Sequence, residues 1–472
     1  MPLRMNHKMA VGIVYVLAMF MSALDGTIIN VALPTIGEEF QIPPAATGAI
    51  NIGYLVSLAM FLPVAGWLGD RWGTKRVFLF ALGLFTVASA LCGIATNIAA
   101  LNVFRVLQGI GAGLITPVAM AILFRTFTHE ERPEISRLLV VPIALAPAMG
   151  PVIGGFFVDQ LSWRWVFYIN IPFGILALLI GKAYLSEHVE PSVGRFDLKG
   201  FVLSLAGFSM TIYALTQGPV KGWETPEILF TGIVGLVLMV SLVIVELRVD
   251  KPMIDLRLFE DPVFRTMSLI GLCAAGGLLG MLFVFPLMYQ HALNETALQT
   301  GLTTFLEALG LMLASQMMPW SLKKLGLRCL IIFALLGSII TFVLIALFVA
   351  SNPWLLRGLM FSVGFFLGHA VGVVQITAFK HIDSPSMSRA TTLFNMQNRL
   401  GSMLGVAILA SFLGTSSAKG NEQVNLLIYQ YALMGAAMFL LVAFIIALRF
   451  KEKTADTDHQ AEVSLQNMEK VE

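Results

Sequence analysis

Long apolar runs, separated by short polar segments, recur along nearly the whole chain. A membrane-spanning helix needs about 20 mostly apolar residues, and glycine or proline inside such a helix is tolerated. The runs that meet this requirement predict fourteen transmembrane helices, at residues 10–33, 46–69, 77–95, 98–124, 135–158, 165–185, 198–217, 227–246, 267–290, 298–320, 329–350, 355–379, 388–414 and 428–449. The expected fold class is therefore an all-α polytopic membrane protein.

Lysine and arginine gather on one side of these predicted helices. If the N-terminus is cytoplasmic, 24 of the 30 Lys and Arg residues fall in cytoplasmic segments and 4 in outer loops, while Arg105 and Arg399 lie within helices. Because cytoplasmic loops are enriched in these residues, both termini are predicted to be cytoplasmic. The first apolar run is too long for a signal-peptide core, so we expect it to remain in the mature chain.

Composition excludes most soluble functions. The 472 residues are 57% hydrophobic and 12% charged, with a net charge of +2, whereas soluble domains carry about 25% charged residues. Cys92, Cys273 and Cys329 lie far apart and form no metal or redox motif. The sequence has no Gly-x-x-x-x-Gly-Lys-Ser/Thr loop for nucleotide phosphates, so ATP is not the expected direct energy source. We expect no metal, no cofactor and no nucleic-acid partner.

Two polar segments mark boundaries in the chain. Residues 246–265 (ELRVDKPMIDLRLFEDPVFR) separate eight predicted helices from six, and their charges alternate in sign around a few apolar residues. This pattern predicts a short interfacial helix. The segment from Lys451 onward is mostly polar and is predicted to be disordered.

Three stretches combine polar residues with glycine or proline. In "GWLGDRWGTKR" (66–76) Asp70 sits among glycines, which permit a tight turn between helices. In "LNVFRVLQGIGAGLITP" (101–117) Arg105 lies within a predicted helix, and Gln108 follows three residues later on the same face. In "APAMGPVIGG" (146–155) small residues allow close helix approach and two prolines bend the helix.

These stretches resemble the signature motifs of the major facilitator superfamily. The first resembles the motif between helices 2 and 3, with Gly69 and Thr74 as departures, and the second resembles the helix 4 arginine motif. The third resembles the helix 5 motif of proton-driven exporters, with Ala146 as a departure. The stretches "LDGTIINVALP" (24–34), "SWRWVFYINIPFG" (162–174) and "KPMIDLRLFEDPVF" (251–264) resemble the 14-helix drug/proton antiporter branch.

The resemblance implies a fold and an activity. It implies two six-helix bundles, residues 1–190 and 251–450, with two additional helices in residues 191–250 and a cytoplasmic tail at 451–472. It also implies a monomeric multidrug efflux transporter of the bacterial inner membrane. This transporter would exchange protons for amphiphilic drugs, cationic ones above all, by alternating access of the two bundles around a central site.

Gate residues follow from the same resemblance. A charged inner gate is expected from Asp70, Arg71 and Lys75, and a packing hinge in helix 5 from Gly150, Pro151, Gly154 and Gly155. In the second half the corresponding stretch is "PWSLKKLGLR" (319–328), where Lys323 occupies the position of Asp70. The acidic gate residue is therefore expected in one half only.

Proton coupling is assigned to three ionisable residues inside predicted spans. Such residues are costly in a membrane and are functional candidates by default. With a rise of 1.5 Å per residue, Asp25, Arg105 and Glu307 all lie roughly 10–13 Å from the outer ends of their helices. Arg105 close to Asp25 would favour its ionised form, and separation would favour protonation. The structural alternative is that Asp25 is only a satisfied hydrogen-bond partner between helices.

The substrate cavity is expected to include further polar residues within the spans. The candidates are Asp25, Gln108, Glu307, His369, Asn395 and Asn398. Thr303 and Thr304 lie one turn before Glu307 and are placed to solvate it. For His369 a hydrogen-bonded helix contact is the alternative, and for the two asparagines cavity lining and helix pairing both stay open.

Other functions are not excluded by the sequence. Within the transporter class, an exporter of an endogenous metabolite and a proton-coupled importer stay open, although the helix 5 motif argues against import. A channel or a membrane-embedded enzyme would belong to a different class. The enzyme would need clustered His, Cys or paired carboxylates, whereas the seven histidines are scattered.

Overall fold

The computed structural model describes most of the chain. The described residues are 6–41, 44–128, 130–190, 196–249, 254–293, 297–348, 352–383, 385–417 and 426–450, together with Pro252 and Glu295. The predicted disordered tail from Lys451 lies outside them. Their elements are helices only: α1 (His7–Glu39), α2 (Pro44–Trp72), α3 (Thr74–Gly93), α4 (Ile98–Thr126), α5 (Arg132–Gln160), α6 (Trp165–Tyr168), α7 (Asn170–Tyr184), α8 (Leu198–Lys221), α9 (Pro226–Arg248), η1 (Leu256–Glu260), α10 (Pro262–Leu287), η2 (Met288–Ala292), α11 (Ala297–Phe348), α12 (Pro353–Ala378), α13 (Met387–Ser417) and α14 (Leu426–Arg449).

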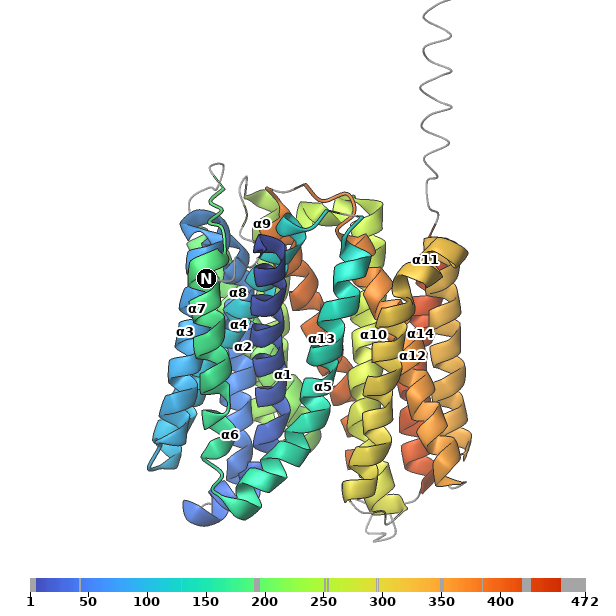
Figure 1. Ribbon diagram of the computed structural model, residues 1–472. Coiled ribbons are helices and arrows are strands. Elements are labelled where there is room, and N and C mark those ends of the chain that lie inside the picture. The colour runs from blue at the N-terminus through green and yellow to red at the C-terminus, as the bar shows by residue number, and fades with distance from the viewer. Residues whose placement is uncertain are drawn as a thin grey trace, which may run out of the picture.

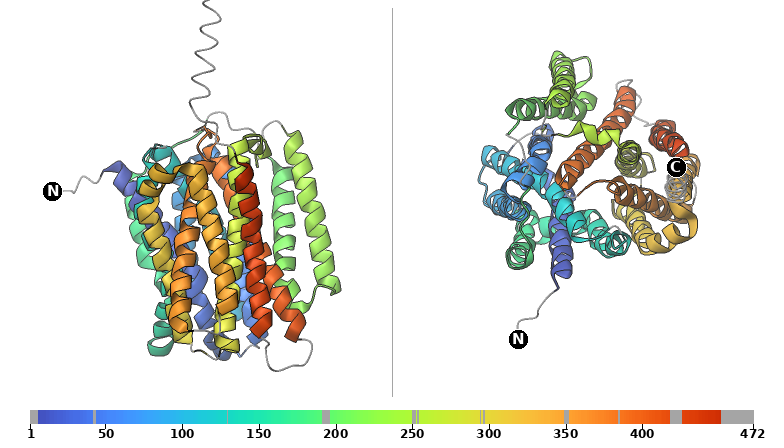
Figure 2. Two further views of the ribbon diagram at one scale, coloured as in Figure 1. Left: turned by 90° about the vertical axis from the view of Figure 1, so that its right-hand side faces the viewer. Right: turned by 90° about the horizontal axis from the view of Figure 1, so that it is seen from above.

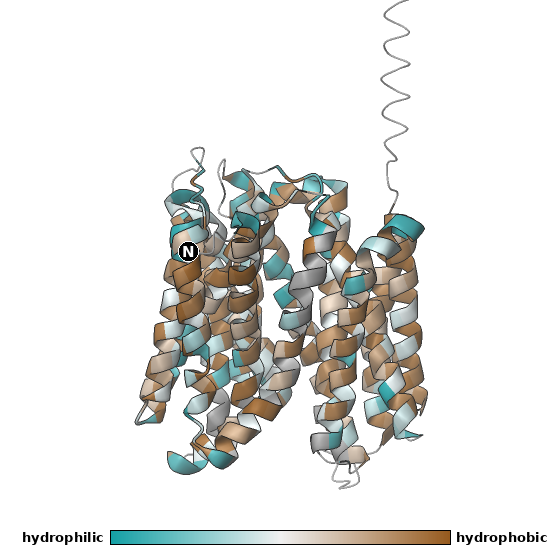
Figure 3. Ribbon diagram, in the orientation of Figure 1, coloured by the Kyte–Doolittle hydropathy of each residue, from teal (hydrophilic) through white to brown (hydrophobic). Residues whose placement is uncertain are grey.

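The long helices run side by side as a bundle (Figure 1). Apolar residues cover its sides, and hydrophilic residues gather toward its two ends (Figure 3). In the described part of the chain, 11 helices are long and apolar enough to cross a membrane. In a bilayer only a helix satisfies every backbone polar group within one segment, which is why these runs fold as helices. The all-α multi-pass fold is confirmed, while the count of fourteen spans stays a prediction.

Three predicted spans differ from the helices observed. The predicted helices at 298–320 and 329–350 are continuous in α11 except for a turn at Gly326, whose φ of 72° and ψ of 167° are not helical. Glycine adopts such a positive φ without steric cost. The predicted helix at 165–185 is divided at Ile169 into α6 and α7.

The helices associate in two halves, which lie on the left and on the right of Figure 1. In the first half α4 packs on α2 and α3, and α1 packs on α5 and α7. In the second half α10 packs on α13 and α14, and α11 packs on α12. The halves meet where α13 contacts α2 and α4 and where α11 contacts α5.

The hairpin of α8 and α9 lies at the edge of the bundle (Figure 2). Its two helices pack on each other, and α8 also contacts α2 of the first half and α13 of the second. Beyond the end of α8, the Trp223 Nε1 atom donates a hydrogen bond to Ser411 Oγ on α13, at 2.7 Å. The hairpin therefore touches both halves.

The polar segment between α9 and α10 folds over one end of the bundle. It contains the five-residue 3₁₀ helix η1, in the place where the sequence predicts a short interfacial helix. Arg389 of α13 forms an ion pair with Asp255 at 3.0 Å, and Arg257 donates a hydrogen bond to the Val249 carbonyl oxygen at 3.1 Å. These contacts hold the segment against α13 and against the end of α9.

Close contact between α2 and α4 depends on glycine. A Cβ atom on Gly113 would lie 2.3 Å from the Leu58 carbonyl oxygen, and one on Gly109 would lie 2.4 Å from the Tyr54 carbonyl oxygen. Both contacts are with backbone atoms, which cannot relieve a clash by a change of rotamer as a side chain can. The two glycines thus set the spacing of the helices that carry the polar site described below.

We predict that Gly113→Ala destabilises the folded chain, because the added methyl group must push α2 away from α4. Overpacking of this kind costs about 1–3 kcal/mol. The matched control is Gly83→Ala on α3, where a Cβ atom would meet nothing within 4 Å. Thermal unfolding of the purified full chain in detergent measures both variants. An unchanged melting temperature in Gly113→Ala would contradict the close packing.

Candidate functional site

A buried polar cluster joins four helices of the first half. Asp25 of α1 accepts hydrogen bonds from Arg105 Nη1 (2.7 Å), Gln108 Nε2 (2.8 Å) and Asn170 Nδ2 (3.0 Å). Ser89 of α3 accepts from the same Gln108 and Asn170 nitrogens, at 3.2 and 3.1 Å. All five side chains are fully buried. The structure thus brings Asp25, Arg105 and Gln108 into one hydrogen-bonded network.

Both Asp25 oxygens are occupied in this network. Oδ2 pairs with Arg105, and Oδ1 accepts from Gln108 and Asn170. An ionised carboxylate is an acceptor at both oxygens, so the arrangement suits the charged acid. Away from water, an ion pair of this kind is tolerated only when further hydrogen bonds satisfy both groups.

Arg105 is held by aromatic rings as well as by Asp25. Its guanidinium carbon lies 4.2 Å from the centre of the Tyr54 ring and 5.8 Å from that of Phe167. The Nε and Nη2 atoms are buried and have no hydrogen-bond partner among the described residues. Cation–π attraction therefore supplies part of the stabilisation that hydrogen bonds leave out.

Glu307 lies apart from this cluster, on α11 of the second half. Its side chain makes no hydrogen bond or ion pair with any residue that the structure describes. Thr303 and Thr304 do not solvate it as predicted, because their hydroxyls donate to the backbone oxygens of Gln299 and Thr300, at 2.8 and 3.0 Å. A carboxyl group without a fixed partner is available to bind a proton or a cation.

The remaining cavity candidates lie at helix contacts. His369 is buried, with its Nε2 atom 3.1 Å from Ser321 Oγ on α11 and its Nδ1 atom 2.9 Å from the Phe365 carbonyl oxygen. Asn395 donates to the Thr391 carbonyl oxygen at 2.7 Å and to the sulfur of Met120 on α4. Asn398 Oδ1 is buried beside α10 without a described partner.

The predicted gate acid pairs with an arginine that the sequence analysis did not select. Asp70, near the end of α2, lies 3.1 Å from Arg125 at the end of α4, and both side chains are almost fully buried. Arg71 and Lys75 form no ion pair with Asp70. Instead, the Lys75 backbone nitrogen donates to Glu187 at 3.0 Å, and the Arg71 side chain is exposed.

The two halves touch closely at the same end of the bundle. A Cβ atom on Gly66 of α2 would lie 2.7 Å from Thr392 Oγ1 of α13. Thr391 Oγ1 donates to the Pro117 carbonyl oxygen of α4 at 3.2 Å. Arg132 at the start of α5 donates to the Phe379 carbonyl oxygen at 3.2 Å. These contacts close the bundle at the end where α2 meets α3, the upper end in Figure 1.

The predicted helix 5 hinge packs on α1 rather than on the opposite half. A Cβ atom on Gly150 would lie 2.1 Å from Thr27 Oγ1, and one on Gly154 would lie 3.0 Å from the Ile28 carbonyl oxygen. Gly155 has open space around it, and the Pro151 side chain lies outside the described residues. The glycines thus bring α5 against the segment of α1 that follows Asp25.

Several residues of the site were not selected from the sequence. Asn170 and Ser89 complete the network around Asp25, and Arg125 and Arg132 are buried at the closed end. Asn170 carried a usable signal, because it is a lone amide in the apolar stretch "WVFYINIPFG". Arg125 and Arg132 stand near helix ends, where a basic residue usually faces water.

No group of His, Cys, Asp and Glu side chains suited to a metal ion is present among the described residues. The buried charge pairs Asp25–Arg105 and Asp70–Arg125 instead join long apolar helices of the first half, beside the contact between the two halves. Such an arrangement defines a multi-pass membrane transporter, whose ionisable groups inside the membrane mark a path for substrate or ions.

The comparisons give the family. The model of the Major Facilitator Superfamily matches residues 15–406 and again 267–467, so the chain belongs to this superfamily of small-molecule transporters and is not an enzyme. The multidrug export protein EmrB of Haemophilus influenzae is 32% identical over 402 residues, which cover 83% of this chain and 78% of that protein.

One further relative and one solved structure are similar to the chain. The multidrug resistance protein B homolog of Mycobacterium tuberculosis (strain H37Rv) is 29% identical over 406 residues, 85% of this chain and 75% of that protein. The crystal structure of the human organic anion transporter MFSD10 matches with a TM-score of 0.67 and 16% identity, over 94% of this chain and 100% of that one. The latter likeness concerns the fold alone.

We predict that Asp70→Asn loosens the closed end of the bundle, because the variant removes the carboxylate that pairs with the buried Arg125 guanidinium. Breaking one partner of a buried pair costs about 3–5 kcal/mol. The reporter is a cysteine at Thr392, a buried residue of α13 facing Gly66, in a chain whose exposed Cys329 is replaced by serine. Maleimide labelling in permeabilised membranes should rise severalfold in Asp70→Asn.

The matched control for this measurement is Lys75→Gln, which leaves the pair of Asp70 and Arg125 intact. Its labelling should stay at the parent level. Equal labelling of Asp70→Asn and the parent would remove Asp70 from the closure.

Proposed function

We propose that this chain is a proton-driven multidrug exporter of the bacterial inner membrane. The names of the relatives, a multidrug export protein and a multidrug resistance protein homolog, support export of several drugs. The buried pair of Asp25 and Arg105 is the observation that carries proton coupling. An isolated ion pair within a membrane is costly and is kept where it serves a function.

The proposed topology places both termini in the cytoplasm. In Figure 1 the upper end, where α1 begins and α14 ends, would then be the cytoplasmic end. Fourteen spans follow if α5, α13 and both segments of α11 cross the membrane together with the other long helices. The proposed bundles are residues 1–190 and 251–450, with the hairpin of α8 and α9 in residues 191–250, and the chain works as a monomer.

In this topology the structure corresponds to a state closed to the cytoplasm. The contacts of Gly66 with Thr392 and of Arg132 with Phe379 would separate when the halves rock to the opposite state. Arg105, Gln108 and Asn170 all donate to Asp25 here, an arrangement that suits the ionised carboxylate. Before the halves rock, a local shift of α1 against α4 would lengthen the hydrogen bond from Arg105 and let Asp25 take up a proton from the outside.

The proposed cycle exchanges protons for drug molecules. A proton enters from the outside and binds an Asp25 oxygen in place of the hydrogen bond from Arg105, and it leaves to the cytoplasm when the pair forms again. Drug moves outward in the other half of the cycle. Glu307, without a described partner on the opposite half, is proposed as the second acid, which attracts the positive charge of a cationic drug.

We predict that Asp25→Asn abolishes proton-coupled efflux of every drug, because an amide neither carries nor releases the proton. The assay is drug-induced proton movement in proteoliposomes, with drug resistance of a pump-deleted bacterial host measured beside it. Resistance in the wild type should vanish with an uncoupler. Full coupling in Asp25→Asn would show that the acid is only a structural hydrogen-bond partner.

The matched control is Glu39→Gln on the same helix. Glu39 lies beyond the apolar stretch of α1 and pairs with Arg164 at 2.7 Å on the surface. A hydrogen bond from Arg164 holds the pKa of the Glu39 carboxyl below its usual value, and one from Trp163 adds to this effect. Exposed ion pairs contribute about 0–1 kcal/mol to folding stability, so the Glu39→Gln chain should fold and should retain proton-coupled drug efflux.

We predict that Glu307→Gln lowers efflux of cationic drugs by about tenfold, which corresponds to about 1.4 kcal/mol, while neutral drugs are affected little. The physical reason is the loss of a negative charge that no described residue of the chain neutralises. Initial efflux rates of a cationic and a neutral drug in the same vesicles give the ratio. An equal loss for both cargoes would assign Glu307 to proton coupling instead of drug recognition.

A further inference from the structure

A pocket of about 520 Å³ opens on the surface of the first half, far from the polar cluster of Asp25. Its volume falls within the range of about 300–1,000 Å³ that is usual for small-molecule sites. It lies where the end of α2 meets α3 and α4, and it is lined by Leu68, Arg71, Trp72, Arg76, Val77, Phe80, Leu114 and Val189.

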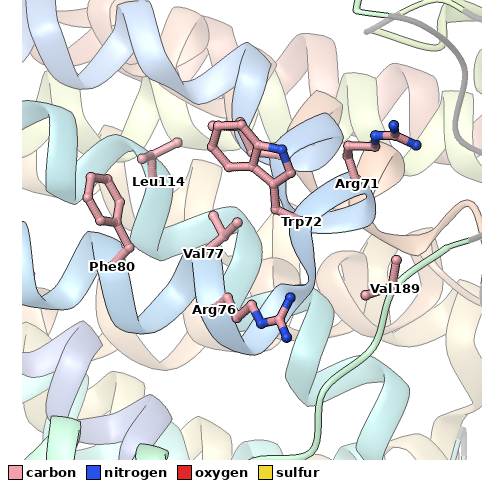
Figure 4. A pocket seen from close by; sticks show the side chains of 8 residues that line it. Arg71, Trp72, Arg76, Val77, Phe80, Leu114 and Val189 are labelled. Atoms are coloured by element: carbon pink, nitrogen blue, oxygen red, sulfur yellow. The ribbon is translucent and has the colours of Figure 1, made fainter.

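The lining divides into an apolar part and a basic part (Figure 4). Phe80, Val77 and Leu114 lie on one side, the Trp72 ring lies between, and the guanidinium groups of Arg71 and Arg76 lie toward the end of the helices. The pocket thus offers positive charge at one end and an apolar wall at the other, in the order that an amphiphilic anion requires.

The pocket faces the membrane. Phe80 is 64% exposed and Trp72 is 59% exposed, although both stand on helices that are apolar enough to span a bilayer. On such helices, exposed aromatic side chains contact lipid, and tryptophan is enriched at the level of the headgroups. Trp72 is followed after one residue by the start of α3, so it stands at this level.

Arg71 has no ion pair among the described residues, and its side chain is exposed. Arg76 lies 3.5 Å from Glu187 but is itself 77% exposed, which leaves most of its donors available. Glu187 also accepts from the Lys75 backbone nitrogen. The described lining of the pocket contains two arginines and no acidic side chain, so the lining itself carries positive charge.

We propose that this pocket is a binding site for an anionic phospholipid, with the phosphate on Arg71 and Arg76 and the acyl chains along Phe80 and Leu114. Basic pockets between transmembrane helices on the cytoplasmic side bind anionic headgroups in this manner. The two arginines repel a cationic drug, so the occupant is a lipid rather than the proposed cargo.

The site is next to the closed end of the bundle. Arg71 directly follows Asp70, whose partner is Arg125. The pocket is lined by Trp72 before the turn at Gly73, where φ is 100°, and by Arg76 after it. A lipid bound to both sides of this turn restrains the junction of α2 and α3. The lipid site therefore adds a contact to the gate from the membrane side.

Trp72 supplies a probe for the experiment. The purified full chain is placed in phosphatidylcholine vesicles that contain either brominated phosphatidylglycerol or brominated phosphatidylcholine, and tryptophan quenching is measured. Subtracting the signal of the matching Trp72→Phe chain isolates the quenching at Trp72 from that of the other six tryptophans. We expect quenching by phosphatidylglycerol to exceed that by phosphatidylcholine and to weaken in high salt.

The arginines are tested by a double variant. A basic residue near the headgroups raises the affinity for anionic lipid about fivefold. The double variant Arg71→Gln with Arg76→Gln should therefore lose almost all of the preference for phosphatidylglycerol over phosphatidylcholine at Trp72. Arg71→Lys with Arg76→Lys keeps the charges and should keep the preference, which separates loss of charge from misfolding. The control Lys323→Gln with Lys324→Gln removes two exposed charges beside the exposed Trp320 and should retain the preference at Trp72.

Three results would overturn the lipid site. The first is equal quenching of Trp72 by the two lipids, which shows bulk contact only. The second is an unchanged preference in the double glutamine variant. The third is relief of quenching by inorganic phosphate but not by sodium chloride of equal ionic strength, which shows that a free anion suffices. None of these results depends on whether the chain exports drugs.

Discussion

The ion pair between Asp25 and Arg105 is the interaction on which the first half of the molecule depends. Away from water, two charges are stable only when each is paired and further hydrogen-bonded, and here the additional donors come from α4 and α7. Helices α1, α3, α4 and α7 must therefore stay in register around one carboxylate. The close approach of α2 to α4 at Gly109 and Gly113 serves the same end, since it brings the Tyr54 ring onto Arg105.

The second half is organised differently. Among the described residues it has no buried ion pair within its membrane-spanning helices, and its acid, Glu307, has no hydrogen-bond or ion-pair partner there. Its polar residues serve mainly as helix contacts, as His369 does with Ser321. A hydrogen-bonded charged cluster in one half and an acid without a described partner in the other suit the proposed carrier, because one acid can bind the proton while the other binds the cargo.

The sequence predicted the fold and the central pair better than the ends of the molecule. Long apolar runs specify helices almost without ambiguity in a bilayer, and equal depth in the membrane led correctly to contact between Asp25 and Arg105. The role of Arg132 could not be predicted, because its partner is a backbone oxygen of Phe379, 247 residues later. The sequence also could not show that Arg71 forms no ion pair with Asp70, since neighbours along a helix do not share a face.

The closed end shows why the missing second gate acid is no obstacle to closure. In the second half, Lys323 occupies the position that corresponds to Asp70. At the closed end, however, the two halves meet through contacts that need no carboxylate in α11. Gly66 admits the α13 backbone, Thr391 donates to a carbonyl oxygen, and Arg132 donates to another. Each is a single neutral or charge-assisted hydrogen bond or a close packing contact, worth about 0.5–3 kcal/mol. A few such contacts hold one state without making it permanent, which alternating access requires.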